Sequence, residues 1–247
     1  MTIADRAVLV TGANRGIGRA LVEEALKRDA KRVYAGTRRP TTYLDRRVTP
    51  LSLDVTNAAQ IQRAVESVES LDILINNAGF ALFDNLSNRA ALEWHLAINL
   101  FGMYDVTQAF LPLLTRSRGS IVNVMSIVAL AALPLVPSYS ISKAAAFSLS
   151  LSLRAILKER GIKVHCVLAG PVDTDMSREF DVPKASPNLV AQSIFAGMDK
   201  GEEDIFPDAM SAAIAESWHS GAIKELERKF GALLVAQHAT SSKDKAD

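Results

Sequence analysis

The chain has 247 residues, of which 49% are hydrophobic and 22% charged, a balance typical of a globular domain and not of a disordered chain. With 28 basic and 27 acidic side chains, the net charge is +1, so no overall field favours nucleic acid or an anionic membrane as a partner. The single cysteine, Cys166, excludes an internal disulfide and fits a reducing compartment. No export signal is visible, and the most apolar segment, residues 127–136, is too short to span a bilayer. We expect a cytoplasmic protein that binds neither nucleic acid nor membrane.

Short apolar runs alternate along the chain with longer segments in which apolar residues recur every three or four positions. The predicted strands cover residues 7–10, 32–37, 48–53, 71–75, 120–125, 162–168 and, more weakly, 204–206. The predicted helices cover residues 16–29, 57–69, 86–115, 139–160 and 189–200, with Asn57 and Asn188 as N-caps. Residues 38–47 contain a proline and are too few for a full helix. This alternation predicts an α/β fold with a mainly parallel sheet.

The first strand is followed by TGANRGIG, residues 11–18, and then by the first helix. Glycine permits a tight strand-to-helix turn, and it lets a phosphate approach the backbone N–H groups at the helix N-terminus. Gly12, Gly16 and Gly18 therefore indicate a dinucleotide site. Their spacing differs from G-x-G-x-x-G, so alone they also fit a simple turn.

The end of the second predicted strand lacks the carboxylate that would hold an unphosphorylated ribose. It reads GTRR instead, and Thr37 and Arg38 occupy the relevant positions. Arg15 and Arg38 could converge on a 2′-phosphate, which favours NADP as the cofactor. The alternative is that both arginines are solvated surface residues, as we expect for Arg39.

A possible catalytic group follows the fifth predicted strand. Ser126 ends that strand, and Tyr139 lies four residues before Lys143, so the last two share one face of a helix. A nearby ammonium favours the phenolate, and we therefore expect Lys143 to lower the pKa of Tyr139. The separate alternatives are a surface Tyr and Lys pair and a serine that merely ends a strand.

Taken together, these motifs make the chain resemble the short-chain dehydrogenase/reductase family. The resemblance rests on TGANRGIG at residues 11–18, LDV at 53–55, NNAG at 76–79, Asn99, Ser126, and YSISK at 139–143. It implies a single doubly wound Rossmann-type domain over residues 1–239 with strand order 3-2-1-4-5-6-7. Residues 176–187 would form a substrate lid, residues 208–237 a C-terminal helical extension, and residues 240–247 a frayed polar tail.

The resemblance also implies the roles of the site residues. Tyr139 would exchange a proton with the substrate oxygen, Ser126 would hydrogen-bond that oxygen, Lys143 would hold the nicotinamide ribose, and Asn99 would anchor a water for proton resupply. The implied cofactor-binding residues are Gly12, Asn14, Arg15, Gly16, Ile17, Gly18, Thr37, Arg38, Asp54, Val55, Asn76, Asn77, Ala78, Gly79, Tyr139, Lys143, Gly170, Pro171, Val172 and Thr174. Ala169 departs from the family pattern, which has proline there, so the following loop would be less stiff.

The substrate is less clearly indicated. The segment IVALAALPLVP, residues 127–137, either lines an apolar pocket mouth or packs against a helix or a subunit. In the lid, Phe180 and Val182 are the only large apolar groups, which predicts an open pocket. His95 and His165 are expected to be structural, and no metal site is expected. The C-terminal extension could pack on the domain, on a partner subunit or over the substrate cleft.

We therefore expect an NADP(H)-dependent oxidoreductase that interconverts an apolar carbonyl compound and its alcohol, acting as a homodimer or homotetramer. One alternative is an NADP-sensing binding protein on the same fold, against which the intact Ser126, Tyr139 and Lys143 argue. Another is an isomerase or dehydratase, which an extended sugar-nucleotide domain would indicate; no such domain is present in the sequence.

Overall fold

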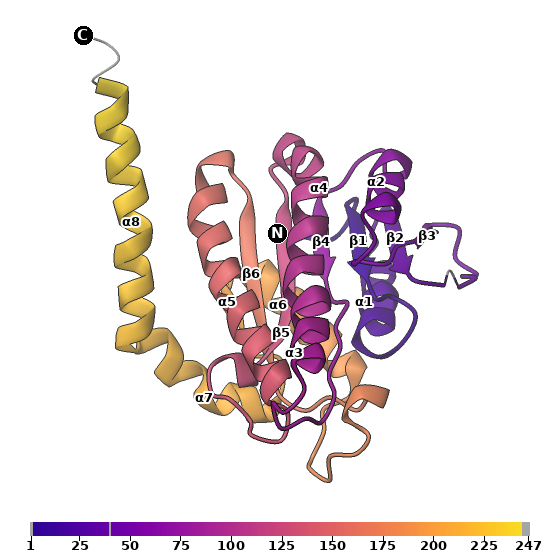
Figure 1. Ribbon diagram of the computed structural model, residues 1–247. Coiled ribbons are helices and arrows are strands. Elements are labelled where there is room, and N and C mark those ends of the chain that lie inside the picture. Colours follow the sequence, from indigo (N-terminus) through magenta and orange to yellow (C-terminus); the bar gives the residue numbers. More distant parts are fainter. Residues whose placement is uncertain (1, 40, 244–247) are drawn as a thin grey trace.

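The computed structural model describes residues 2–39 and 41–243, and the side chains of the last helix as far as residue 232. Seven parallel strands form one sheet in the order β3-β2-β1-β4-β5-β6-β7, which confirms the predicted topology (Figure 1). The strands are β1 (Ala7–Thr11), β2 (Arg32–Thr37), β3 (Val48–Ser52), β4 (Ile73–Asn76), β5 (Ser120–Ser126), β6 (Lys163–Ala169) and β7 (Asp204–Ile205). The order reverses between β1 and β4, so their carboxyl ends leave a crevice there.

Helices cover both faces of the sheet, and the central strands are therefore buried on both sides (Figure 1). The helices are α1 (Gly16–Lys27), α2 (Ala58–Ser67), α3 (Arg89–Leu96), α4 (Gly102–Ser117), α5 (Pro137–Leu157), α6 (Pro187–Lys200), α7 (Ala209–Ser220) and α8 (Ala222–Lys243). One apolar core joins α1 and α6 to one face of the sheet, and a second joins α2, α4 and α5 to the other. Between β2 and β3, the described residues contain no helix, as the short connection predicts.

Two predictions about the helices need correction. Asn57 caps α2 by accepting the Gln60 N–H, as expected, but α6 begins earlier than predicted and is capped by Ser186 instead of Asn188. Pro187 is its first residue, where a missing N–H costs nothing. The predicted helix over 86–115 is divided, because a π-helical turn at Ala97–Phe101 separates α3 from α4. Such turns are frequent at functional sites, and this one contains Asn99.

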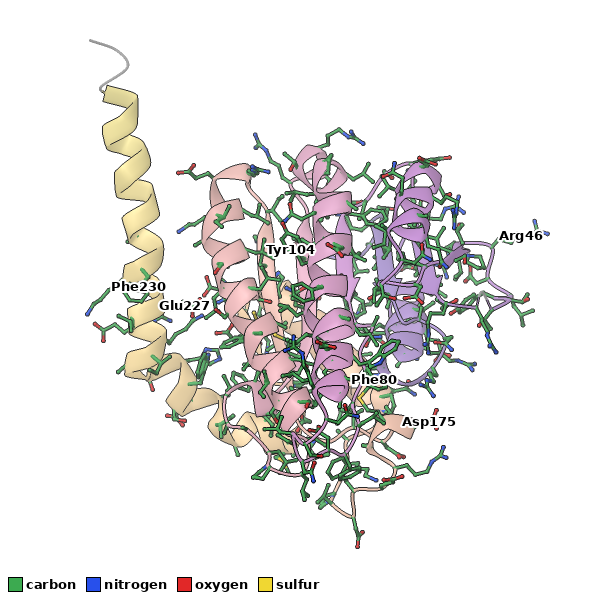
Figure 2. The ribbon with its side chains drawn as sticks, in the orientation of Figure 1. Arg46, Phe80, Tyr104, Asp175, Glu227 and Phe230 are labelled. Carbon is green, nitrogen blue, oxygen red and sulfur yellow. The ribbon has the colours of Figure 1, made fainter. Side chains whose placement is uncertain are left out.

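The C-terminal extension consists of two helices, α7 and α8, where one was predicted. The predicted frayed tail is helical as far as Lys243, and residues 244–247 lie outside the described residues. Figure 1 shows α8 running beside α5 and beyond the sheet. Figure 2 shows Glu227 on the side of α8 nearer to α5, where it accepts a hydrogen bond from Arg154.

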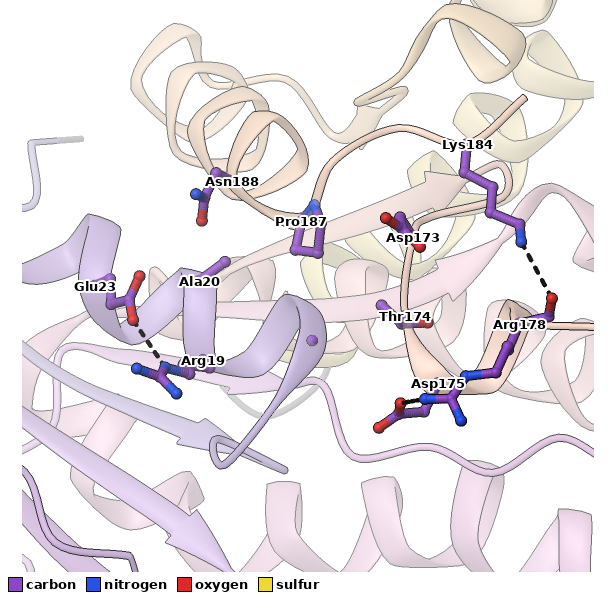
Figure 3. Close-up of a pocket in the computed structure, with 11 residues that line it drawn as sticks. Arg19, Ala20, Glu23, Asp173, Thr174, Asp175, Arg178, Lys184, Pro187 and Asn188 are labelled. Carbon is purple, nitrogen blue, oxygen red and sulfur yellow. Dashed lines mark hydrogen bonds and ion pairs between the residues drawn. The ribbon is translucent and has the colours of Figure 1, made fainter. Parts of the chain in front are cut away.

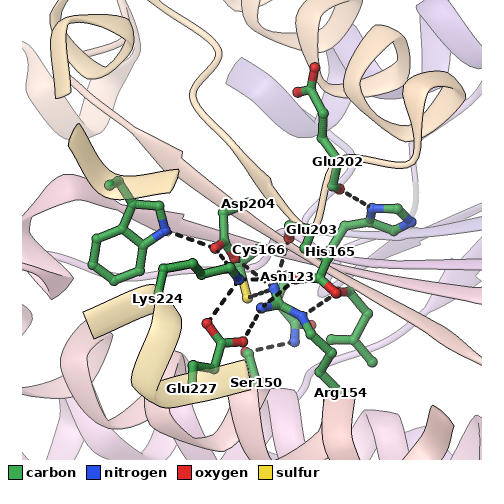
Figure 4. Close-up of polar contacts among 12 residues, drawn as sticks. Asn123, Ser150, Arg154, His165, Cys166, Glu202, Glu203, Asp204, Lys224 and Glu227 are labelled. Atoms are coloured by element: carbon green, nitrogen blue, oxygen red, sulfur yellow. Dashed lines mark hydrogen bonds and ion pairs between the residues drawn. The ribbon is translucent and has the colours of Figure 1, made fainter. Parts of the chain in front are cut away.

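Five ionic side chains, Arg154, Glu203, Asp204, Lys224 and Glu227, dock this extension on the domain (Figure 4). Asp204 is fully buried and pairs with Arg154 at 2.6 Å and with Lys224 at 2.7 Å. Glu227 pairs with the same two cations, and Trp218 donates its indole N–H to Asp204 at 2.8 Å. These contacts join α5, β7, α7 and α8, so the extension packs on the domain.

Among the described helices, one is long and apolar enough to cross a membrane by length and composition alone, over Pro137–Arg160. It contains α5, packs against β5 and β6, and carries the buried Lys143. A core helix of a folded domain has these properties as well.

Candidate active site

The turn between β1 and α1 requires glycine at three positions. Gly12 and Gly16 have φ of +66° and +54°, a conformation that L side chains rarely adopt. At Gly18, a Cβ would lie only 2.1 Å from the carbonyl oxygen of Gly12, so a side chain is excluded. No side chain caps the N-terminus of α1, and its first N–H groups are therefore free to bind an anion.

The NNAG motif after β4 supports this turn. The Asn77 amide donates to the carbonyl oxygens of Thr11 and Gly12 at 2.9 and 3.3 Å, and the Thr11 hydroxyl accepts the N–H groups of Asn77 and Ala78. Asn76 points elsewhere: it is buried and donates to Thr107 and Asn123. The two asparagines thus have separate roles, one holding the glycine turn and the other linking β4 to α4 and β5.

The two arginines predicted to converge on a phosphate differ in their surroundings. Arg38 is exposed beyond β2, whereas Arg15 pairs with Asp175 at 2.9 Å, in the 3₁₀ turn Asp175–Ser177 that begins the predicted lid. Both side chains of this pair are largely exposed, so the pair is weak and Arg15 can leave it at little cost.

The other predicted cofactor residues lie around the same crevice. Asp54 accepts hydrogen bonds from Thr56 after β3, and Val55 packs against Gly102 at the start of α4. Thr174, after β6, lies across from Gly16, where a Cβ would come 3.0 Å from its methyl group. The loops after β1, β3, β4 and β6 therefore border one crevice at the carboxyl edge of the sheet.

Ser126, Tyr139 and Lys143 come together at this edge, as predicted. Ser126 ends β5, while Tyr139 and Lys143 lie one turn apart near the start of α5. Burial raises the pKa of Tyr139 to about 12, although its hydrogen bond with Ser126 acts in the opposite direction. The phenol therefore keeps its proton throughout the neutral range and can donate it.

The expected lowering of the Tyr139 pKa by Lys143 is not found. The Lys143 ammonium lies 5.6 Å from the centre of the Tyr139 ring and donates to the carbonyl oxygen of Val124 at 2.9 Å. Burial lowers the pKa of Lys143 itself to about 8. Desolvation opposes charge on both groups, and in this structure it outweighs their attraction.

Asn99 lies beside this group, in the π-helical turn. Its side-chain amide donates to the Phe80 carbonyl oxygen and to the Ser142 hydroxyl, and its side-chain oxygen accepts the Phe80 N–H. These bonds use both N–H groups of the side-chain amide and one acceptor position of its oxygen. The visible role of Asn99 is to tie the loop after NNAG to α5.

Two residues near Tyr139 were not predicted as part of the site. Asp84 accepts hydrogen bonds from the N–H and hydroxyl of Ser138, at 3.3 and 2.9 Å, and thereby caps α5, whose own N-cap residue Val136 offers no side-chain bond. His95 is buried, donates from Nδ1 to the Ala91 carbonyl oxygen and accepts the Leu82 N–H at Nε2. The structural role predicted for His95 is confirmed, since these bonds fix the loop that carries Asp84.

Aromatic rings connect that loop to the predicted lid. Phe83 and Phe180 stack with ring centroids 4.8 Å apart. Phe83 and Phe180 are far apart in the sequence, so only the folded chain brings them into contact.

Of the apolar segment after Ser126, Ile127, Ala129 and Leu130 pack against the core, while Leu135 is exposed. The first part of the segment therefore packs in the core, as one of the two predicted alternatives has it, and the pocket mouth stays a prediction.

A separate cavity of about 460 Å³ lies between α1 and the predicted lid (Figure 3). Gly16 and Thr174 line it together with charged side chains of both signs, among them Arg19, Glu23 and Asp175. None of the four predicted catalytic residues lines it. Among the described residues, no cluster of His, Cys, Asp and Glu could hold a metal ion.

The model of the short chain dehydrogenases matches residues 6–184, which include the glycine turn and the Ser126, Tyr139 and Lys143 group. The chain belongs to the short-chain dehydrogenase family. It is 37% identical to a short-chain dehydrogenase of Penicillium crustosum, PC-15, over 80% of this chain and 78% of that protein. It is 32% identical to the 3-oxoacyl-[acyl-carrier-protein] reductase FabG of Salmonella typhimurium, over 72% of this chain and 78% of that protein.

A solved structure agrees with this family assignment. A short chain dehydrogenase from Burkholderia cenocepacia J2315, in complex with NADP, superposes with a TM-score of 0.85 and 35% identity. The match covers 93% of this chain and 98% of that one. The present protein is therefore an oxidoreductase of the short-chain dehydrogenase family with a Rossmann-type fold.

Proposed function

We propose that this short-chain dehydrogenase uses NADPH to reduce the carbonyl group of an apolar small molecule, and that the reverse reaction oxidises the alcohol. The observation that carries the proposal is the protonated Tyr139 phenol, hydrogen-bonded to Ser126 and one helical turn from Lys143. The relative of known structure from Burkholderia cenocepacia was solved in complex with NADP, which supports the same cofactor here.

The residues at the crevice fit a dinucleotide. Glycine at positions 12, 16 and 18 allows the tight turn between β1 and α1, and this turn leads into the N-terminus of α1, which no side chain caps. Gly12, Asn14, Gly16 and Ile17 would border the pyrophosphate, while Asp54, Val55, Ala78 and Gly79 would border the adenosine. Pro171, Val172 and Thr174 would face the nicotinamide half. Arg38, with Thr37 beside it, would take the 2′-phosphate, and Arg15 would join it after leaving Asp175.

Bound there, the reduced cofactor supplies the hydride. Tyr139 donates its proton to the substrate oxygen as negative charge develops on it, because the phenol is protonated and only partly covered at the site. Ser126 donates a hydrogen bond to the same oxygen. Below a pH of about 8, Lys143 is charged and can bind ribose hydroxyls and stabilise the tyrosinate that remains. Asn99 keeps α5 and the loop after NNAG in register.

Two features support an apolar substrate. Phe83 and Phe180 stack between the two loops beside the crevice, and Leu82 and Val182, next to them in sequence, are exposed. These side chains offer apolar contact and few hydrogen bonds, so aromatic or medium-chain ketones fit better than polyols.

We also propose that the enzyme is a cytoplasmic homo-oligomer. The exposed face of α5 carries Ile141 and Ile156 and, between them, small residues such as Ala144, Ser148 and Ser152, without a charged side chain. On the neighbouring helix α4, Tyr104 is exposed as well. An uncharged surface of this extent is typical of an interface.

Replacing Tyr139 with phenylalanine tests the reaction. We expect turnover of the best ketone in a substrate panel to fall by about 10²- to 10⁴-fold, because the acid is lost, while the Kd for NADPH stays unchanged. Tyr104→Phe, on the exposed face of α4, is the matched control and should retain full turnover. Running the assay with NADH in place of NADPH tests the cofactor preference.

Three results would contradict these assignments. Full activity in Tyr139→Phe would exclude it as the acid. A wild-type protein that binds NADPH but reduces nothing in a panel of ketones and aldehydes would instead be a cofactor-binding protein. Faster turnover of polyols than of aromatic ketones would contradict the apolar substrate.

A further inference from the structure

Asp208, the N-cap residue of α7, is a buried carboxylate without a cationic partner. It is 6% exposed, and among the described residues it forms no salt bridge. Its Oδ1 accepts the Ser211 N–H at 3.0 Å, and its Oδ2 accepts the Ser211 hydroxyl at 2.8 Å and the Gly170 N–H at 2.7 Å. Three donors and the N-terminus of α7 therefore stabilise the charge.

The bond to Gly170 reaches the loop that would face the nicotinamide. Gly170 directly follows β6 and begins the segment Gly170, Pro171, Val172, Asp173 and Thr174. A Cβ on Gly170 would lie 2.6 Å from Oδ1 of Asp208, so the close approach requires glycine at this position. The carboxylate and the glycine are thus matched to each other across 38 residues of sequence.

Further along, other backbone groups hold the same segment. The Asp173 N–H donates to the Ala185 carbonyl oxygen and the Ala185 N–H donates to the Pro171 carbonyl oxygen, while Ser177 and Thr174 donate to the Val172 carbonyl oxygen. Pro171 has no N–H to donate. The Asp208 carboxylate therefore holds the first N–H after β6, and the bridge to Ala185 holds the residues that follow.

We propose that Asp208 is a positioning residue for the cofactor, which sets the path of residues 170–174 under the nicotinamide half. This inference rests on the proposed function, because it assumes that a dinucleotide occupies the crevice. It also gives the C-terminal extension a role at the site. Asp204, four residues earlier, anchors α7 and α8 to the domain, so the buried ionic cluster holds in place the strand and helix between which Asp208 lies.

The test compares NADPH with 2′,5′-ADP, which contains only the adenosine half of the cofactor. Asp208→Ala and the isosteric Asp208→Asn should raise the Kd for NADPH about tenfold, since a hydrogen bond to a charged group is lost or reversed. The Kd for 2′,5′-ADP should stay within about twofold of wild type, because its contacts lie at the glycine turn and β2. Both constants are measured by isothermal titration calorimetry, with a thermal melt to verify folding.

Ser211→Ala is the matched control. It removes the hydroxyl from the α7 cap but leaves the bond between Asp208 and Gly170, so it should lower the Tm without changing either Kd. Equal weakening of NADPH and 2′,5′-ADP in the Asp208 variants would overturn the inference. So would a loss of NADPH affinity in Ser211→Ala that matches Asp208→Ala. A wild-type protein that binds neither ligand would overturn the proposed function itself.

Discussion

Tyr139 and Lys143 show how burial shifts the pKa of individual residues at the site. Burial raises the pKa of the Tyr139 phenol to about 12 and lowers that of the Lys143 ammonium to about 8, since each neutral form is favoured away from water. At neutral pH, the phenol is a proton donor and the lysine still carries its charge. The site therefore begins in the state required for carbonyl reduction.

The charge on buried Lys143 should cost stability, which Lys143→Met can reveal. A fall of the pKa from 10.5 in the unfolded chain to about 8 in the folded protein lowers the free energy of unfolding by roughly 3 kcal/mol at pH 7. Methionine carries no charge and should recover this stability, less about 1 kcal/mol for the lost hydrogen bond to the Val124 carbonyl oxygen. The variant should be more stable than wild type at pH 7 and should lose turnover.

The same pKa shift makes the stability of the wild-type protein depend on pH. The folded pKa lies below the unfolded one, so the unfolded chain holds more protons between pH 8 and 10.5, and wild-type stability rises with pH across that window. The advantage of Lys143→Met over wild type should therefore shrink from pH 8 to 10.5. Urea unfolding at several pH values measures it, and an advantage that widens above pH 8 would contradict the burial argument.

At the level of secondary-structure elements, ionic contacts attach the C-terminal extension where apolar packing is sparse. Of the exposed large apolar side chains, Ile223, Leu226 and Phe230 belong to the described part of α8, while its Lys224 is buried against Asp204. Arg154 from α5 completes the cluster, and the attraction of these charges lowers the pKa of Asp204 despite its burial. Removing the charge of such a buried carboxylate while its cationic partners stay in place destabilises the folded protein.

Asp204→Asn should accordingly destabilise the protein by about 3 kcal/mol, because Arg154 and Lys224 stay buried and lose their one fully buried anion, keeping only Glu227 and the more exposed Glu203. Thermal or urea unfolding measures the loss. Lys229→Ala provides the control on the same helix, since the exposed pair of Lys229 with Glu225 should contribute less than about 1 kcal/mol. Equal effects of the two substitutions would show that the cluster does not hold the extension.

At the scale of the whole molecule, the uncharged outer face of α5 distinguishes this domain from an ordinary soluble surface. The other side of α5 packs on the sheet and positions Tyr139 and Lys143. If copies of the chain associate through this face, as proposed, assembly also stiffens the helix that carries the acid. Oligomer formation and catalysis would then share one element.

A charge placed on this face should dissociate the oligomer. Ser148→Glu puts a carboxylate in the middle of the exposed side of α5, where an interface would have to bury it unpaired. Analytical ultracentrifugation should show oligomers for wild type and monomers for the variant. Ser217→Glu, on exposed α7, should leave the mass unchanged. A monomeric wild-type protein, or an unaffected Ser148→Glu, would locate the interface elsewhere or exclude it.

Local sequence was sufficient for the elements whose signals are short-range. The alternation of strands and helices predicted the seven strands and a mainly parallel sheet, because parallel strands need crossover connections, whereas the strand order came from the resemblance to the family. The Gly12, Gly16 and Gly18 turn and the helical spacing of Tyr139 and Lys143 were likewise legible, since each depends on neighbours within one turn. The N-cap of α6 and the break at Asn99 were missed, because both depend on small local energies that packing overrides.

The amino-acid sequence by itself determined the family, the topology and the residues able to carry the chemistry, since their spacing along the chain fixes their type and order. Only the tertiary structure decided how those residues are held and charged. The capping of α5 by Asp84 and the bond from Gly170 to Asp208 join residues 54 and 38 positions apart. The pKa of Tyr139 depends on how much water the folded chain removes from it. Such contacts and burial arise only when distant segments pack, and no local pattern encodes them.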